Sequence, residues 1–514
     1  LLTRDLVLDE PDDFDIADQH ALCRLVNWTG MLGGRVLLSS ATLPPALVQA
    51  LFAAYCTGRN AWKLACGEPG ASLNVCCAWF DEDDACSGEF SVAADFYDAH
   101  CRFAHRRAMR LPDKPVLRRA QIASVTSSSA DAGSVITAYA DTLHHEIINL
   151  HNLHHQCDAK GHCISFGLVR MANIVPLVAV AKKLMSTPSP EGYHIHYCVY
   201  HSQHPLAIRA YIEQRLDSAF TRHDPQIVWH LPEVKQALRQ GEAKHHLFVV
   251  LATSVVEVGR DWDADWGMIE PSSMRSLIQF AGRIQRHRQK QPESPNMLIL
   301  NKNIRALRER SPAYCQPGFE SARFLLSSHD LTEILHPDCY QLINAIPRIL
   351  DSQVACKKNQ RFDSLVSLEH ARLWEELLGR SEDYPVAAQW WRLPLQWSGE
   401  LQRRTPFRRS QNESQFFLYM QDDVDEPRFM ARDDGAVGWK DPGVFRFYPL
   451  EQAKGVWPWI DIDYAKVMRG LAESTNHALS RVSERFGEIN LRSNVTAGEV
   501  WFWHPLLGVF HALS

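Results

Sequence analysis

Short apolar runs alternate with helical patterns in the middle of the chain. The apolar runs lie at residues 164–169, 196–200, 247–252 and 297–300. Between them, residues 174–185 and 208–220 carry apolar side chains at the spacing of a helix that buries one face. Strands that alternate with helices in this way are typical of a doubly wound parallel sheet. We therefore predict an α/β fold over residues 159–305.

Changes in this pattern divide the chain into segments. Near the start, residues 6–8 and 35–42 have the character of two strands, separated by an acidic turn and a helix. The pattern loosens from residue 66 and weakens again after about residue 305. We predict a strand–helix unit at 1–65, a connecting insertion at 66–158, the main sheet at 159–305, a helical linker at 306–399 and a C-terminal accessory domain at 400–514.

Composition limits the function without identifying it. The 514 residues carry a net charge of −6, so any contact with nucleic acid must come from local basic patches. The 13 cysteines follow no regular framework, and we expect reduced, mostly buried thiols in a cytoplasmic protein. The longest apolar stretch contains Pro176 and is far too short to span a bilayer, so no membrane contact is predicted.

An acidic turn follows the first apolar run. Asp9, Glu10, Pro11 and Asp12 form a D-E-x-D sequence directly after residues 6–8. Ligands bind at the carboxyl ends of strands in open α/β sheets, and phosphoryl transfer needs a divalent cation and an oriented water. We predict that Asp9 and Glu10 hold Mg²⁺, that Glu10 activates the attacking water, and that Asp12 contacts the nucleotide. An acidic surface turn is the plainer alternative.

A second motif carries positive charge. Gln279, Gly282, Arg283 and Arg286 form a Q-x-x-G-R-x-x-R sequence, which predicts a helix with both arginines on one face. Both guanidinium groups could then reach one phosphate, and an arginine finger is worth roughly 10³–10⁵ in rate. We predict that Gln279 and Gly282 contact the nucleotide and that Arg283 and Arg286 are catalytic. The alternative is a solvated basic helix.

Polar residues end two further predicted strands. Ser40 and Thr42 follow the strand beside the acidic one, and their hydroxyls are predicted to contact the nucleotide. His201 and Ser202 end the strand at 196–200, and we place them on the nucleic-acid side.

The loop after the strand at 247–252 has a similar character. The hydroxyl of Thr253 can bond a nucleic-acid phosphate, while Gly259 lets the backbone approach a nucleotide and Asp261 can accept from a ribose hydroxyl. Without its neighbouring motifs this would be an ordinary loop.

Three other groups of residues give weaker indications of function. Histidines crowd between residues 144 and 162 beside Cys157 and Cys163, but the spacing of metal-binding motifs is not met, so a polar helix before a strand is favoured. The His-Asp pairs at 223–224 and 329–330 receive no role. Arginines at 403, 404, 408 and 409 bracket Phe407, which fits either a grip on single-stranded nucleic acid or a solvated loop.

The order of these motifs resembles motifs II, III, V and VI of superfamily 2 helicases. More narrowly, residues 8–15, 165–173 and 200–202 resemble the CRISPR-associated helicase–nuclease (Cas-three) family of type I interference systems, in its I-F form. The resemblance covers residues 1 to about 300.

This resemblance implies two RecA-like lobes, the first partial and the second complete, with a helical connector and a small C-terminal domain. It implies ATP and Mg²⁺ as cofactors, and a motor that moves 3′ to 5′ on single-stranded DNA after recruitment by an RNA-guided surveillance complex. Arg170 joins Thr253, His201 and Ser202 as an expected nucleic-acid contact. Phage-encoded inhibitors are further expected partners.

The resemblance also implies segments that this sequence does not contain. The chain opens on an apolar run without Met, so we expect the latter part of a longer protein, whose upstream part supplies a phosphate loop and a His-Asp nuclease domain. The chain by itself is then expected to be inactive. An RNA helicase, a restriction-type translocase and a non-catalytic nucleic-acid-binding scaffold are the alternative functions.

Overall fold

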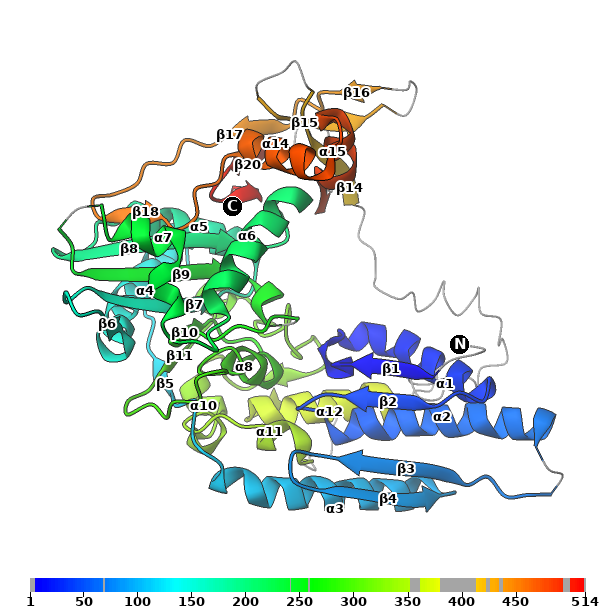
Figure 1. The fold of residues 1–514 in the computed structure, drawn as a ribbon. Coiled ribbons are helices and arrows are strands. Elements are labelled where there is room, and N and C mark those ends of the chain that lie inside the picture. The colour runs from blue at the N-terminus through cyan, green and yellow to red at the C-terminus, as the bar shows by residue number, and fades with distance from the viewer. Residues whose placement is uncertain are drawn as a thin grey trace.

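The structure is a computed structural model that describes residues 5–67, 70–240, 242–257, 259–351, 361–379, 413–421, 426–433, 438–492 and 500–512. The arginine cluster around Phe407 lies outside these residues. Figure 1 shows a large sheet at one side of the molecule, a smaller strand–helix unit and hairpin at the other, and the C-terminal elements above.

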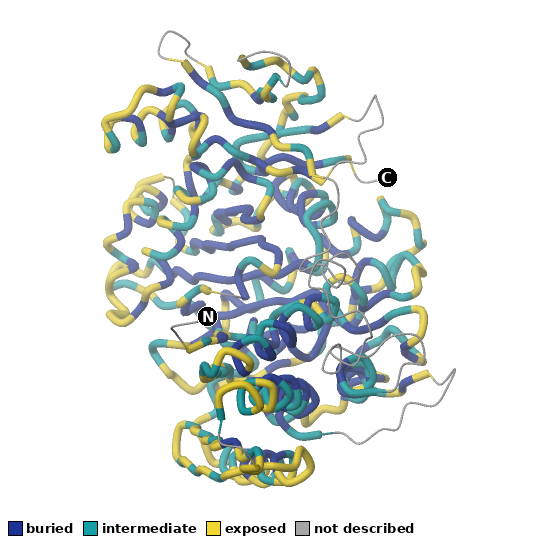
Figure 2. The backbone as a smooth tube through the Cα atoms, turned by 90° about the vertical axis from the view of Figure 1, so that its right-hand side faces the viewer, coloured by how far each residue is buried: buried dark blue, intermediate teal, exposed yellow. Residues whose placement is uncertain are grey.

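A parallel sheet forms the centre of the fold. Its strands run in the order β18 (Val456–Pro458), β8 (Tyr193–Tyr200), β9 (His245–Ala252), β7 (Cys163–Arg170), β10 (Trp266–Ile269), β11 (Met297–Leu300) and β5 (Ala120–Ala123), with β6 (Gln156–Cys157) antiparallel to β7. Figure 2 shows these central strands as buried. Parallel strands covered on both faces need continuous apolar sequence, which is why this region has the clearest pattern.

Helices cover both faces of this sheet. One face packs against α4 (Ala132–His154) and α5 (Ile174–Met185), in a core that includes Val199 and Leu251. The other face packs against α6 (Leu206–Phe220), α7 (Pro232–Ala237) and α8 (Met274–Ala281), in a core that includes Phe248. The predicted doubly wound, RecA-like α/β fold is therefore confirmed, and we call this unit the second lobe.

The second lobe extends beyond residues 159–305. Strand β5 and helix α4 lie in the range that the sequence assigned to a connecting insertion, and β18 comes from the range assigned to the accessory domain. Both strands are short and lie at the edges of the sheet, so neither has the continuous apolar run of a central strand. Their pairing is visible only in three dimensions.

A strand–helix unit, which we call the first-lobe segment, precedes the second lobe. Strands β1 (Leu6–Asp9) and β2 (Val36–Ser39) are parallel, with Asp9 opposite Ser39, so the turns that follow them leave the same edge. Helices α1 (Gln19–Met31) and α2 (Pro45–Cys66) pack closely at Gly58, where an added Cβ would lie 2.0 Å from the Asn27 carbonyl oxygen.

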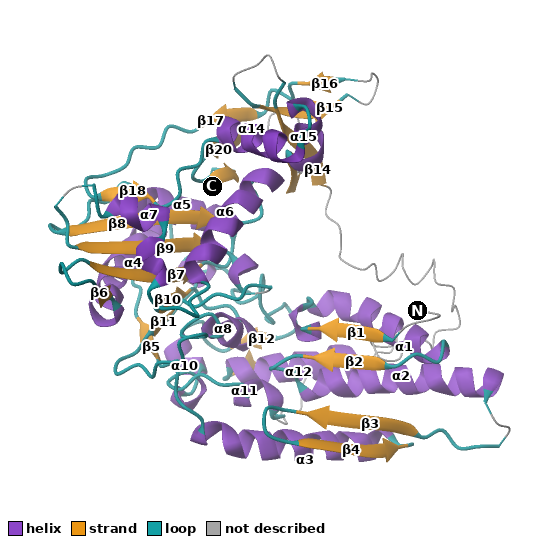
Figure 3. Cartoon of the chain, viewed as in Figure 1, coloured by secondary structure: helices purple, strands orange, loops and turns teal. Residues whose placement is uncertain are grey.

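An antiparallel hairpin and a helix extend from this segment, as Figure 3 shows. The hairpin is β3 (Val75–Phe80) with β4 (Ala85–Phe90), followed by α3 (Ala93–Arg110). Phe96 of α3 stacks on Phe52 of α2 with ring centroids 3.7 Å apart, which joins the hairpin unit to the first-lobe segment.

The rest of the described chain consists mostly of short elements, and its strands form three small sheets. They are α9 (Ile304–Leu307), β12 (Leu325–Leu326), α10 (Leu331–Ile334), α11 (Ile346–Ile349), β13 (Arg361–Phe362), α12 (Leu365–Leu378), β14 (Glu413–Tyr419), β15 (Arg428–Arg432), β16 (Trp439–Lys440), β17 (Phe445–Phe447), α14 (Tyr464–Thr475), α15 (Leu479–Phe486), β19 (Glu488–Arg492), β20 (Trp501–His504) and β21 (Gly508–Phe510). The sheets are β12-β13, β16-β15-β14-β19 and β17-β20-β21.

The cysteines differ from expectation. Cys157 and Cys163, which face each other on β6 and β7, form a disulfide in the structure instead of two free thiols. Among the free cysteines of the described residues, Cys23 and Cys198 are buried and the others are partly or fully exposed. Within the same residues, no helix combines the length and apolar character needed to cross a bilayer.

Candidate functional site

A cavity of about 830 Å³ lies where the first-lobe segment meets the second lobe. Its lining includes the four residues predicted to be catalytic, Asp9, Glu10, Arg283 and Arg286. The predicted nucleotide contacts at Thr42, Gly259, Asp261, Gln279 and Gly282 also line it. The fold therefore gathers the acidic turn and the arginine motif, which are far apart in sequence, around one space.

Glu10 is positioned by its backbone and by two side chains. Its φ of 47° places it in the left-handed region, and its N–H donates to the Ser39 carbonyl oxygen at 2.7 Å. The Ser40 hydroxyl lies 2.6 Å from Glu10 Oε2, and Gln279 Nε2 donates to the same oxygen at 3.3 Å. Because Gln279 belongs to α8, this contact joins the first-lobe segment to the second lobe.

Asp12 has a different position from the one predicted. Its side chain is 1% exposed, and the residue does not line the cavity. One carboxylate oxygen accepts from the Thr42 hydroxyl at 2.7 Å, and the other lies 2.7 Å from the Ser40 hydroxyl. The single hydroxyl hydrogen of Ser40 can thus serve Asp12 or Glu10, but not both at once. Asp12 and Ser40 act on the site by holding the two turns together.

The two arginines do not lie on a helix, contrary to the prediction. Helix α8 ends at Ala281, and Gln285 has a φ of 49°, so the chain turns between Arg283 and Arg286. Arg283 is 8% exposed and donates to the Glu257 carbonyl oxygen at 2.5 Å. Burial, together with the charge of Arg286, lowers the pKa of Arg283 to about 10, which still leaves it protonated at neutral pH.

Arg286 is the more exposed cation of the pair. Its side chain is 42% exposed and forms an ion pair with Asp261 at 2.6 Å. His287 also lies 3.0 Å from Asp261, and its hydrogen bond, with the charge of Arg286, lowers the pKa of that carboxyl. Gly259 has a φ of 67° and open space where a Cβ would lie, as a backbone that approaches a ligand requires. An exposed ion pair of this kind costs little to exchange for another partner.

Two predicted nucleic-acid contacts are contradicted by burial. Arg170 is fully buried, and its Nε donates to Glu257 at 2.5 Å while its other nitrogens contact Glu270 and Ser276. His201 is also fully buried and lies 2.9 Å from the Leu507 carbonyl oxygen. Neither side chain has a surface that a nucleic acid could reach.

Arg170 instead supports Arg283 through Glu257. The side chain of Glu257 accepts from Arg170 and from the Ser276 hydroxyl, while its carbonyl oxygen accepts from Arg283. A buried side-chain network thus fixes the carbonyl that orients Arg283. The other two predicted nucleic-acid contacts differ in exposure: Ser202 is exposed at the turn after β8, and Thr253 is 6% exposed after β9.

Sequence reasoning missed several residues of the cavity. Asp13 lines it, and burial raises the pKa of this carboxyl to about 7, against the charge of Arg275 and with help from Asp12 and Glu10. Arg118 lines it too and donates to the carbonyl oxygens of Ala281 and Ile284. Asp13 follows the acidic motif directly and could have been included. Arg118 lies in a segment with no motif, so only the fold reveals it.

Two family models match the chain. One is described as CRISPR-associated nuclease/helicase Cas3, C-terminal, and matches residues 163–289. The other is described as CRISPR-associated Cas3 subtype I-F/YPEST-like, C-terminal domain, and matches residues 442–511. These ranges cover most of the second lobe and the end of the chain.

Two curated relatives match the chain over nearly its whole length. Both are named CRISPR-associated nuclease/helicase Cas3 subtype I-F/YPEST. The protein from Pectobacterium atrosepticum is 52% identical over 100% of this chain, and that from Pseudomonas aeruginosa is 40% identical over 99%. The chain spans 47% of the length of each relative.

A solved structure titled as T. fusca Cas3 with AMPPNP is similar at 19% identity and a TM-score of 0.37, covering 59% of this chain and 30% of that one. A similarity of this size adds nothing to the site.

Proposed function

We propose that this chain, which belongs to the CRISPR-associated nuclease/helicase Cas3 family of subtype I-F/YPEST, is the part of an ATP-dependent DNA motor that closes around the nucleotide. The observation that carries the proposal is the shared cavity, in which Glu10 of the first-lobe segment is hydrogen-bonded to Gln279 of the second lobe. Carboxylates face guanidinium groups across this cavity, as phosphoryl transfer requires.

The donors present fit a magnesium ion. Asp9, Glu10 and Asp13 bring carboxylate oxygens to the cavity, and Asp13 Oδ2 is buried without a hydrogen-bond partner. Mg²⁺ prefers such oxygen ligands and usually keeps several waters. We propose Asp9 and Glu10 as its holders, and the ion would neutralise charge on the transferred phosphate.

The remaining steps belong to side chains of this chain. Glu10 accepts a proton from the attacking water or orients it, since its carboxylate lies at the cavity surface. Arg283, held by the Glu257 carbonyl, and Arg286, released from Asp261, stabilise the transferred phosphoryl group. Gln279 donates a hydrogen bond to Glu10 from the second lobe, so this contact links the two lobes during turnover. We take the triphosphate-gripping loop to be supplied by the rest of the parent protein.

Movement of the lobes would be passed to DNA at the strand ends of the second lobe. Ser202 and Thr253 follow the neighbouring strands β8 and β9, which end at the same edge of the sheet. In the parent we propose 3′-to-5′ movement on single-stranded DNA, recruitment by an RNA-guided surveillance complex and delivery of the strand to a nuclease domain.

The substrate class is tested by ATPase stimulation of the full-length parent. Single-stranded DNA and RNA of equal length and base order are compared at the same salt concentration, because phosphate contacts make binding salt-dependent. We expect stimulation by DNA and little by RNA. Preferential stimulation by RNA would favour an RNA helicase, and no ATPase with either strand would favour a non-catalytic scaffold.

A further inference from the structure

Three histidines converge on one face of the large sheet, away from the motifs discussed above. His194 and His196 are two residues apart on β8, so their side chains lie on the same face. His246 on β9 is directly opposite His194 in the parallel register. One ring nitrogen from each lies within 4.8 Å of the others.

The spacing of the closest pair matches that of zinc ligands. His196 Nε2 and His246 Nδ1 are 3.3 Å apart. Two nitrogens that each lie about 2.0–2.1 Å from a tetrahedral zinc ion are about 3.3–3.4 Å from each other. The rings of His194 and His246 have centroids 5.3 Å apart and are nearly perpendicular, so His194 approaches the pair from a different direction.

Hydrogen bonding leaves lone pairs available at this cluster. His246 Nε2 lies 3.2 Å from the Ala243 carbonyl oxygen, and an N–H donated there leaves Nδ1 as a bare lone pair directed at His196. A backbone carbonyl is one of the usual partners of the second ring nitrogen in a metal-bound histidine. His194 Nδ1 is buried and has no hydrogen-bond partner.

Two of the three imidazoles are shielded from solvent. His196 and His246 are 3% and 1% exposed. A hydrogen bond between His196 and His246 would by itself explain the positions of these two rings. It would not explain why Nδ1 of His194 is buried without a partner.

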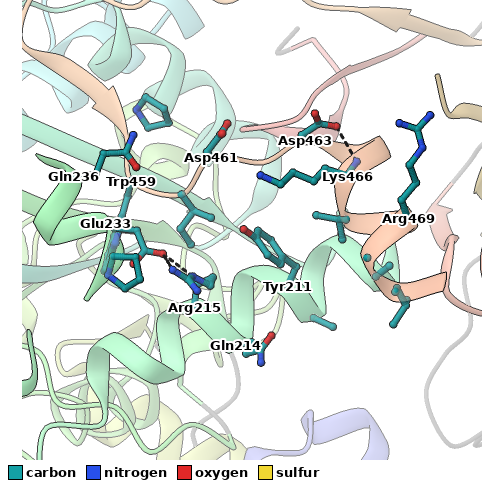
Figure 4. A pocket seen from close by; sticks show the side chains of 18 of the residues that line it. Tyr211, Gln214, Arg215, Glu233, Gln236, Trp459, Asp461, Asp463, Lys466 and Arg469 are labelled. Carbon is teal, nitrogen blue, oxygen red and sulfur yellow. Dashed lines mark hydrogen bonds and ion pairs between the residues drawn. The ribbon is translucent and has the colours of Figure 1, made fainter. Parts of the chain in front are cut away.

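One histidine of the cluster borders a cavity. His196 and Trp457 line this cavity, which has a volume of about 1100 Å³. Figure 4 shows this cavity between α6, which carries Tyr211 and Arg215, and α14, which carries Lys466 and Arg469. Trp457 of β18 pairs with His196 in the sheet and packs its ring 6.1 Å from that of His194.

From this arrangement we infer that His194, His196 and His246 form a transition-metal site, suited to Zn²⁺, with three protein ligands and a fourth position left for water or a substrate. Three imidazoles with one free position are a donor set of zinc sites in which water or a substrate completes the tetrahedron. The site lies where β18, from the C-terminal part of the chain, joins the second lobe. It does not depend on the proposed motor function.

The test measures zinc binding to the metal-free chain by competition with a chromophoric chelator. We expect one tight equivalent of Zn²⁺ in the unsubstituted chain. His194→Gln should weaken that equivalent by at least about 10- to 100-fold, which is the loss seen when only a supporting partner of a ligand is removed. His194 is only partly buried, so the folded state should survive the substitution, and circular dichroism checks this.

Two matched variants separate this cluster from other candidate ligands. His105→Gln removes an exposed histidine of α3, and Cys157→Ser disrupts the group formed by His155, Cys157 and Cys163. Both should keep the tight equivalent. Co²⁺ in place of Zn²⁺ should give the absorption of a tetrahedral site in the unsubstituted chain and lose it in His194→Gln. The inference is overturned if the chain binds no tight zinc, or if His194→Gln binds it as well as the unsubstituted chain.

Discussion

Replacing Glu10 by Gln separates a catalytic role from a structural one. The substitution keeps the size of the side chain and removes its charge. The amide oxygen can still accept from Gln279 Nε2, which lies 3.3 Å from Glu10 Oε2. The Ser40 hydroxyl, 2.7 Å from Asp12, can donate there instead. At most one hydrogen bond is lost, so the free energy of unfolding should fall by no more than about 0.5–1.5 kcal/mol.

The expected effect on turnover is much larger. A general base contributes roughly 10²–10⁴ in rate. Each tenfold loss corresponds to about 1.36 kcal/mol, so the activation barrier should rise by about 3–5 kcal/mol, well above the structural cost. In the full-length parent, we expect ATP affinity to be retained while the DNA-stimulated kcat falls by that factor.

The assay pairs steady-state ATPase at saturating single-stranded DNA with equilibrium binding of a fluorescent ATP analogue. Asp338→Asn is the matched control, because Asp338 is an acidic residue that lines the same cavity but is highly exposed and paired with His336. It should leave kcat unchanged. Unaltered turnover in the Glu10→Gln protein, or equal losses in both variants, would refute the assignment of Glu10.

Four further outcomes follow from the contacts described. Arg286→Lys in the parent should lose much of the roughly 10³–10⁵ rate factor of an arginine finger, since a point charge does not replace a planar fork, and wild-type kcat would contradict this. Arg170→Met should lower the free energy of unfolding in urea by about 3–5 kcal/mol, because it leaves the buried Glu257 carboxylate without its cationic partner. A loss of DNA affinity without a change in stability would instead support a nucleic-acid role for Arg170. Gly58→Ala should lower the free energy of unfolding by about 1–3 kcal/mol, because its Cβ would lie 2.0 Å from a carbonyl oxygen. Gly470→Ala, on a helix with open space around it, should raise the free energy of unfolding by up to about 1 kcal/mol in the same urea titration. Burial lowers the pKa of His100 to about 4, so its imidazole stays neutral in the folded state down to that pH. The unfolded chain therefore binds more protons between pH 4 and 6.5, and the free energy of unfolding should fall as the pH is lowered through that window. The fall should be shallower in His100→Gln.

The sequence alone determined the type of fold and identified most of the motif residues that line the cavity between the lobes. Strands buried on both faces must be apolar along their whole length, so β7 and β9 could be predicted without a structure. The acidic turn and the arginine motif could be recognised for a related reason. Each is a local run whose residue types, at that spacing, suit metal and phosphate binding.

Burial and pairing at a distance could be decided only by the tertiary structure. Arg170 and His201 look like exposed polar residues at strand ends, yet both are fully buried because Glu257 and the Leu507 carbonyl, remote in sequence, supply their partners. The helix predicted through Arg286 stops at Ala281, and Ile284 just beyond it forms an isolated bridge with Ala264, which lies before β10.

The same distinction explains the histidine cluster. The sequence shows that His194 and His196 are two residues apart in one predicted strand. The third histidine, His246, lies 50 residues after His196 and belongs to the neighbouring strand. Sequence fixes which side chains alternate along a strand, since that is a property of the local backbone. Only the register between strands, set by the packing of the whole sheet, decides which of them meet.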